Sequence, residues 1–239
     1  MPIASEVQTM FSAIAPRYDT LNRILSLGTD RAWRRRCCDA LEVTPDDLAA
    51  DLCCGTGDLA LALAGRGATV IAADFSREML AIANAKGVGR LAEADCLRLP
   101  FAGESFSLVT VAFGVRNLAD LEGGLREMRR VLRPGGRLGI LEFARPRGTL
   151  FSRIYGAYLR WAVPVIGAAV SGRRSAYRYL ADSIRHFPDQ QGMMALMRRI
   201  GFTSVRHIDF VRGVAALYIG IRPASSGSTS HQQGHERLL

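Results

Sequence analysis

The stretch DLCCGTGD (residues 51–58) lies between an apolar run and a helix-forming run. A glycine-rich turn between a strand and a helix lets backbone N–H groups approach a ligand at the positive end of the helix. A dinucleotide-binding turn has the form G-x-G-x-x-G, and here Gly55 and Gly57 are not followed by the third glycine. Asp51, which precedes the turn, would repel a pyrophosphate and attract an ammonium or sulfonium group. The turn therefore predicts a nucleoside site for a cationic ligand.

Apolar runs and helical patterns alternate on both sides of this turn. The predicted strands cover residues 48–53, 68–74, 89–95, 106–113 and 137–143. The predicted helices between them cover residues 58–64, 76–86 and 118–132, with Ser76 as an N-cap. A later helix and two closing strands are predicted over residues 189–202, 204–211 and 214–221. This alternation predicts an α/β fold with a doubly wound, mostly parallel, seven-stranded sheet.

Two segments fall outside the alternation. The N-terminal segment 5–41 predicts one helix over 5–15 and another over about 24–41. Residues 144–187, rich in arginine and aromatic residues, predict a helical insert before the last helix and strands. We therefore expect a single domain over residues 1–222.

Composition excludes several classes of protein. The 239 residues are 49% hydrophobic, but no run of about 18 uncharged apolar residues predicts a membrane span. Residues 1–10 lack the basic and apolar regions of a signal peptide. Four of the five cysteines form adjacent pairs, which fits neither a disulfide framework nor a zinc site. We expect a cytoplasmic protein without a metal, and a disordered tail over 223–239.

The net charge of +9 comes from 30 arginines and one lysine, Lys86. Arginine is spread over the whole chain, whereas a nucleic-acid-binding protein would concentrate it on one face with aromatic platforms. We attribute most of the excess to genome composition and expect no nucleic-acid partner. The oligomeric state stays open, with a homodimer as one candidate.

Two further acids follow the second and third predicted strands. Asp74 ends the second strand, where a carboxylate accepts hydrogen bonds from vicinal ribose hydroxyls. Asp95 ends the third strand and could accept from an adenine amino group, with the backbone N–H of Cys96 serving a ring nitrogen. Together with Asp51, these acids surround one glycine turn and point to S-adenosylmethionine. The alternative is that each acid caps a helix or forms a turn.

Four segments resemble the ubiquinone/menaquinone biosynthesis C-methyltransferase family: YDTLNRILSLGTDRAW (18–33), FGVRN (113–117), RVLRPGGRLGILEFA (130–144) and YRYLADSIRHFP (177–188). The resemblance covers about residues 5–222. It implies a Rossmann-like class I S-adenosylmethionine-dependent methyltransferase acting on a ring carbon of a polyprenylated quinol. Its cofactor residues map onto Thr56, Asp74, Asp95 and Cys96, and we add Asp51, Gly55 and Gly57 from the turn.

The resemblance also has departures. Asp30 stands where the first signature has histidine, which argues against a catalytic role for that position. Because no leader precedes the first predicted helix, the chain is more similar to the menaquinone members, which convert demethylmenaquinol to menaquinol. C-methylation of 2-methoxy-6-polyprenyl-1,4-benzoquinol, or of another small acceptor, is the alternative. Two alternative hypotheses come from other functional classes: a nicotinamide-dependent oxidoreductase and a non-catalytic binding module.

The proposed reaction needs an activated ring carbon, because carbon becomes nucleophilic when an adjacent hydroxyl ionises. We expect Arg116 to stabilise the quinolate and Asn117 to orient the ring oxygen. The alternative for Arg116 is a structural salt bridge. Tyr177 is our first candidate for moving the proton, and Tyr179, His186 and Asp19 are further candidates.

The segment FSRIYGAYLRWAVPVIGAAVSGRR (151–174) is apolar, contains Arg160, and is flanked by arginines. This composition suits a lid over an apolar channel or a segment lying at a lipid interface. We expect the polyprenylated quinol to bind here and at the N-terminal helices, with transient contact between the protein and the inner face of the membrane. The alternative is a core helix followed by a loop.

Overall fold

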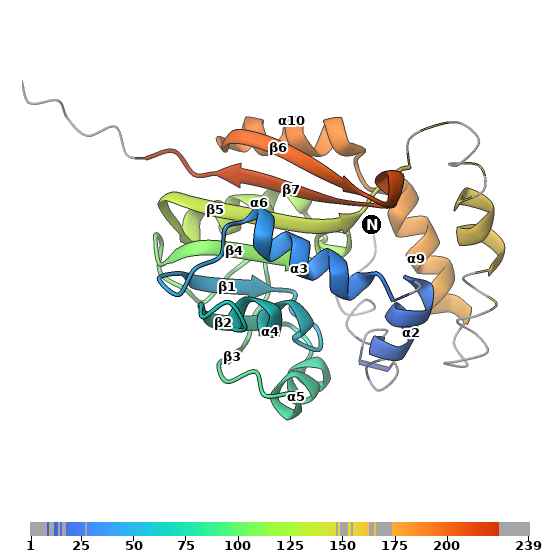
Figure 1. Cartoon of the computed structure of the whole chain (residues 1–239), viewed down its shortest axis with the longest axis horizontal. Coiled ribbons are helices and arrows are strands. Elements are labelled where there is room, and N and C mark those ends of the chain that lie inside the picture. The colour runs from blue at the N-terminus through green and yellow to red at the C-terminus, as the bar shows by residue number, and fades with distance from the viewer. Residues whose placement is uncertain are drawn as a thin grey trace, which may run out of the picture.

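A seven-stranded sheet organises the computed structural model, which describes residues 9, 12–13, 15, 18–26, 28–146, 148, 153, 155–162, 165 and 174–224. The strand order is β3-β2-β1-β4-β5-β7-β6, and the described strands are β1 (Leu48–Leu52), β2 (Thr69–Asp74), β3 (Leu91–Glu93), β4 (Phe106–Ala112), β5 (Leu132–Phe143), β6 (Thr203–Phe210) and β7 (Ala215–Ile221). The first five strands are parallel, and β7 pairs antiparallel with both β5 and β6. The predicted mostly parallel sheet is confirmed (Figure 1).

The strand order reverses between β1 and β4. The chain proceeds outward from β1 through β2 to β3 and then returns to place β4 on the other side of β1. At such a switch point the connecting segments leave in opposite directions, which opens a crevice at the carboxyl ends of the strands. The glycine turn after β1 lies at this crevice.

Helices cover both faces of the sheet. The α3 (Asp30–Ala40), α4 (Asp58–Ala64) and α5 (Arg77–Ala85) helices lie on one face, and α6 (Leu121–Val131) and α10 (Gln190–Ile200) lie on the other (Figure 1). The two faces of the sheet have separate hydrophobic cores, and adjacent residues of β4 pack into different ones. Leu108 belongs to the cluster around Trp33, and Val109 belongs to the cluster around Met128. Burying each such side chain contributes about 1.5–3 kcal/mol.

Local capping signals in the sequence set several helix ends. The Ser76 hydroxyl accepts from the Met79 N–H at 3.3 Å, which confirms the predicted N-cap. The Asp120 and Asp189 carboxylates accept from backbone N–H groups three residues on and begin α6 and α10. Gly201, with φ of +98°, ends α10 in the left-handed conformation that glycine adopts without strain.

Three predicted boundaries were wrong. The fifth strand, expected over 137–143, begins at Leu132, which already pairs with Phe106 of β4. The helix expected over 24–41 is two helices, α2 (Tyr18–Leu25) and α3, because Gly28 takes a φ of +74° in the turn between them. The third strand covers Leu91–Glu93 rather than 89–95, so Asp95 lies two residues beyond its end. Most of the helix predicted over 5–15, and the tail from 225 onward, lie outside the described residues.

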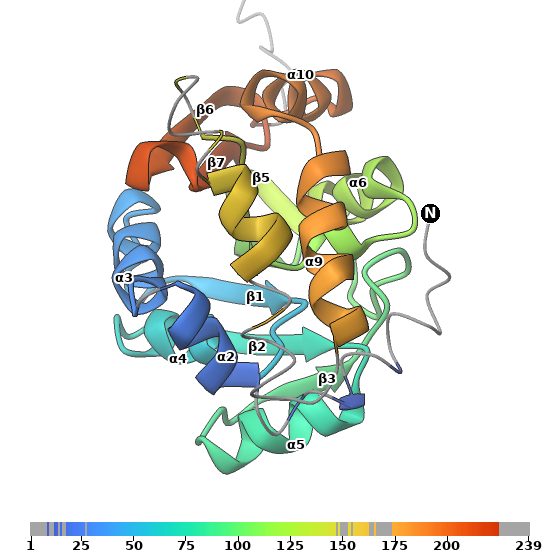
Figure 2. The same ribbon diagram turned by 90° about the vertical axis from the view of Figure 1, so that its right-hand side faces the viewer.

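The insert and the N-terminal helix lie at one end of the sheet. The α2 helix, α9 (Arg174–His186) and the short η3 helix (Tyr158–Ala162) lie beyond the carboxyl ends of the parallel strands (Figure 2). The short helices η2 (Val115–Asn117) and η4 (Val211–Gly213) follow β4 and β6. In the described part of the chain, every helix is too short or too polar to cross a bilayer.

Candidate active site

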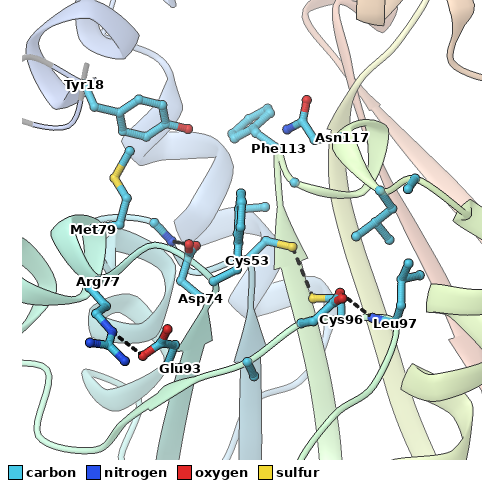
Figure 3. A pocket seen from close by; sticks show the side chains of 18 residues that line it. Tyr18, Cys53, Asp74, Arg77, Met79, Glu93, Cys96, Leu97, Phe113 and Asn117 are labelled. Atoms are coloured by element: carbon cyan, nitrogen blue, oxygen red, sulfur yellow. Dashed lines mark hydrogen bonds and ion pairs between the residues drawn. The ribbon is translucent and has the colours of Figure 1, made fainter. Parts of the chain in front are cut away.

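A cavity of about 570 Å³ opens at the carboxyl ends of the parallel strands (Figure 3). Its walls come from the turn after β1, the end of β2, the segment after β3 and the segment after β4. It brings together five residues predicted from sequence: Gly55, Asp74, Asp95, Cys96 and Asn117. Tyr18 reaches over the cavity from α2, opposite Phe113 and Asn117 (Figure 3).

Asp74 shapes the glycine turn from the end of β2. Its carboxylate accepts from the Gly55 N–H at 2.8 Å and from the Ser76 N–H at 3.0 Å. Burial raises the pKa of this carboxyl, and the two backbone donors oppose that rise. Each carboxylate oxygen has two acceptor sites, so Asp74 holds the turn and retains acceptor capacity for a diol.

Asp95 and Cys96 form the neighbouring wall. The Asp95 carboxylate is exposed and accepts from the Leu97 N–H at 2.9 Å, which orients the loop after β3. The Cys96 thiol lies 3.3 Å from the thiol of Cys53. This thiol–thiol contact and burial raise the pKa of Cys53, so its side chain fills space at the cavity floor as a small apolar group.

A smaller cleft of about 20 Å³ adjoins the main cavity behind the glycine turn. Asp51 lines it and is 1% exposed. Its Oδ1 accepts from the Thr110 hydroxyl at 2.8 Å, whereas Oδ2 has no partner among the described residues. Burial raises the pKa of Asp51 to about 7. A cation in the cleft would stabilise the ionised carboxylate and partner the orphaned oxygen.

Thr56 and Gly57 serve the turn in different ways. The Thr56 hydroxyl donates to Asp19 of α2 at 2.5 Å, and Thr56 lines the smaller cleft. Gly57 lines neither of the two cavities. A Cβ there would lie 2.6 Å from Val88 and 3.1 Å from Ala83, and its φ is +81°. Glycine is needed at this position so that α4 packs closely on α5.

The predicted catalytic residues differ in their placement. Asn117 lines the main cavity and accepts from the Tyr179 hydroxyl at 3.1 Å. Arg116 instead points into the protein, where its guanidinium donates to Glu142 at 2.7 Å and to the Phe113 carbonyl. The Glu142 side chain is fully buried, and burial raises its pKa. The side chain of Tyr177 lies outside the described part.

Sequence reasoning missed several residues at the site. Tyr18 and Phe113 line both cavities, and Glu142 holds Arg116. Arg34 lines the smaller cleft, although in the sequence it belongs to a run of arginines. A signal for its burial was present, because Arg34 follows the apolar Trp33 and stands four residues after Asp30, the spacing of a helical ion pair. Among the described residues, no group of three His, Cys, Asp or Glu side chains could hold a metal ion.

Comparison with known proteins gives a match over nearly the whole described fold. The model of the ubiE/COQ5 methyltransferase family matches residues 3–222. The chain belongs to this family. A demethylmenaquinone methyltransferase of Thermus thermophilus is 50% identical over 222 residues, which are 90% of this chain and 100% of that protein. The ubiquinone/menaquinone biosynthesis C-methyltransferase UbiE of Geotalea daltonii is 43% identical over 225 residues, or 90% of this chain and 95% of that protein.

Solved structures agree on the methyltransferase fold. An S-adenosylmethionine-dependent methyltransferase of Thermotoga maritima superposes with a TM-score of 0.66 and 18% identity, covering 90% of this chain and 99% of that one. The family and the fold imply S-adenosylmethionine as the methyl donor. The site of this family member fits that group, because an orphaned buried carboxylate oxygen adjoins a cavity with acids at two strand ends.

Proposed function

We propose that this chain transfers a methyl group from S-adenosylmethionine to a ring carbon of demethylmenaquinol, producing menaquinol. Relatives at 45–50% identity over about nine-tenths of the chain are named demethylmenaquinone methyltransferase. The observation that supports the proposal is the cavity at the strand switch point, which Asp74 and Asp95 line and which adjoins the smaller cleft lined by Asp51.

The chain's own residues hold the donor. Asp74 would accept from the ribose hydroxyls, and the Asp95–Cys96 segment would contact the base. Asp51 would face the cationic amino acid end, while Thr56 and Asp19 keep α2 over the turn. When bound, S-adenosylmethionine would supply an activated methyl group: the ring carbon would take it as the methyl–sulfur bond breaks, S-adenosylhomocysteine would leave, and the ring carbon would then lose its proton. Holding the acceptor in line with that methyl group is worth up to roughly 7–11 kcal/mol in favourable cases.

The acceptor side of the cavity orients the ring. Asn117 presents its amide at the wall, and Phe113 and Tyr18 provide aromatic surface for a planar quinol. Arg116 lies one residue from Asn117, and its charge is balanced by Glu142. Because Glu142 neutralises this charge and Arg116 does not line the cavity, we propose that the arginine positions the Val115–Asn117 turn at the wall rather than acting as a free charge beside the quinolate.

We propose that the insert meets the lipid surface from which a polyprenylated quinol enters. Trp161 is 71% exposed and Val165 is 60% exposed, and Arg153 and Arg160 beside them are exposed as well. Apolar side chains with basic neighbours favour the interface of an anionic bilayer. This segment lies at the same end of the sheet as the cavity (Figure 2).

One experiment tests the proposed reaction. The purified chain is incubated with methyl-labelled S-adenosylmethionine and either demethylmenaquinol or 2-methoxy-6-polyprenyl-1,4-benzoquinol, and the products are identified by mass. We expect methylation of demethylmenaquinol and loss of transfer in Asp74→Asn. Preferred methylation of the benzoquinol would mean that the acceptor is the ubiquinone precursor and would overturn demethylmenaquinol as the substrate. Transfer to neither quinol, with donor binding intact, would refute it.

A further inference from the structure

The smaller cleft contains two buried groups of opposite charge, each with an unpartnered atom. Asp51 and Arg34 both line it. Asp51 Oδ2 and Arg34 Nε are buried and have no hydrogen-bond partner among the described residues. Native proteins rarely leave such atoms unsatisfied, and a ligand is one reason for doing so. An acceptor and a donor in one cleft suit a zwitterionic group.

Arg34 retains unused donors although it is held firmly. Its Nη1 donates to Asp30 at 2.5 Å and lies 3.7 Å from Asp58, and its guanidinium carbon is 5.9 Å from the centre of the Phe113 ring. A guanidinium has five N–H donors, and its hydrogen bonds to described residues run through Nη1 alone. The side chain is only 9% exposed, so water has limited access to the remaining donors.

The cleft and the main cavity adjoin one another and share part of their walls. Five residues line both of them: Tyr18, Cys53, Gly55, Ala112 and Phe113. The cleft of about 20 Å³ has room for little more than one water-sized sphere. A ligand whose nucleoside lies in the main cavity would therefore place only its charged tip at the cleft.

We propose that Arg34 binds the carboxylate at the amino acid end of the donor, while Asp51 faces the ammonium of the same end. This inference rests on the proposed function and deepens it. The two charges of an α-amino acid are separated by a single carbon, and Arg34 and Asp51 present the complementary pair. A guanidinium matches a carboxylate with two parallel N–H groups, which makes Arg34 a determinant of donor selectivity.

The test compares ligands that differ only in the carboxylate. Calorimetry measures binding of S-adenosylmethionine and of decarboxylated S-adenosylmethionine to the wild type and to Arg34→Gln. We expect the wild type to bind S-adenosylmethionine at least tenfold more tightly. In Arg34→Gln this preference should fall below twofold, with little change in the affinity for the decarboxylated ligand. Arg35→Gln, an exposed position on the same helix, is the matched control and should keep the full preference.

Because Arg34→Gln leaves the buried Asp30 carboxylate unpaired, Asp30→Asn/Arg34→Gln is measured as well. That double variant has no unpaired charge and should lose the same preference. Equal binding of the two ligands by the wild type overturns the inference, as does an equal loss for both ligands in the variants. If the wild type methylates neither quinol but shows a preference that Arg34→Gln loses and Arg35→Gln keeps, the proposed function is refuted and the role of Arg34 is supported.

Discussion

At the residue scale, Asp51 links cofactor binding to pH. Its pKa is about 7 in the folded chain because of burial, against about 3.9 in an unfolded chain. Between these pH values the folded state keeps a proton that the unfolded chain has released, so the free energy of unfolding falls as pH rises from about 3.9 to about 7, and Asp51 causes no further change above that. A difference of three pKa units corresponds to a change of at most about 4 kcal/mol in the free energy of unfolding.

The Asp51→Asn variant tests this linkage. Without ligand, we expect it to raise the melting temperature relative to wild type at pH 8 and to change it little at pH 4.5, because asparagine does not ionise. The same variant should weaken S-adenosylmethionine binding at least tenfold at pH 8. Asp46→Asn, which removes an exposed carboxylate outside the site, is the control for the general loss of an acidic charge. Equal stabilisation at both pH values would argue against a raised pKa at Asp51.

The hydroxyl of Tyr179 is a second feature at this scale. It donates to the Asn117 carbonyl oxygen, which turns the amide nitrogen of Asn117 away from α9. Tyr179→Phe should lower kcat for quinol methylation by about threefold to tenfold, as expected for one hydrogen bond of about 1 kcal/mol, and leave S-adenosylhomocysteine affinity unchanged. In an Asn117→Ala background the same change should have no further effect.

Tyr218→Phe is the matched control for Tyr179, because the Tyr218 hydroxyl is buried without a partner among the described residues. It should keep full kcat. Additive effects of Tyr179→Phe and Asn117→Ala would show that the tyrosine does not act through the amide.

At the element scale, the single lysine of the chain joins α2 to the helix that follows the glycine turn. Lys86, at the end of α5, pairs with Asp19 of α2 and donates to Asp58 of α4 at 2.7 Å. Asp19 also accepts from Thr56. One compact ammonium with three rotatable donors serves two carboxylates from different helices. The α2 helix thereby holds Tyr18 over the cavity.

Lys86→Met should loosen this attachment, because it removes the ammonium that joins Asp19 to Asp58 and leaves Arg34, 3.7 Å from Asp58, as the neighbouring cation. We expect S-adenosylhomocysteine to dissociate about three to ten times faster in stopped-flow measurements at low salt, with a smaller effect on association. Arg66→Met removes an exposed ion pair with Asp39 and is the control for general charge loss. An unchanged dissociation rate in Lys86→Met would mean that α2 does not limit ligand release.

The same elements mark what sequence could and could not predict. The Ser76 cap and the Gly201 helix end depend on contacts within a few residues, and both were predicted correctly. The acids at the strand ends could be predicted from the alternation of strands and helices, because the carboxyl ends of parallel strands meet at one edge of the sheet. The Lys86–Asp19–Thr56 cluster and the Arg116–Glu142 pair join distant segments. Such pairs depend on the packed register of helices on the sheet, which no local pattern specifies.

At the scale of the whole molecule, the balance of charge differs between two regions. More acids than arginines line the cavity and its cleft, which suits a cationic donor, although the chain as a whole has a net charge of +9. The exposed arginines of the insert lie beside Trp161 and Val165 at the end of the sheet where the cavity opens. A basic and apolar surface near the opening would bring the site to an anionic leaflet, at about 1 kcal/mol for each basic residue near the lipid.

Vesicle sedimentation tests this arrangement. The chain should bind vesicles containing phosphatidylglycerol, and binding should weaken as salt rises from 50 to about 500 mM because the Debye length shortens to a few ångströms. Affinity for S-adenosylhomocysteine should change much less over the same range, since Asp74 and Asp51 are buried. Trp161→Ser should reduce vesicle binding at least threefold and raise KM for a long-tailed quinol. Arg66→Ser, in the turn that precedes the amino end of β2, should do neither. If Trp161→Ser raised KM equally for a quinol without a prenyl tail, the tryptophan would act on the ring site, and lipid contact would lose its support.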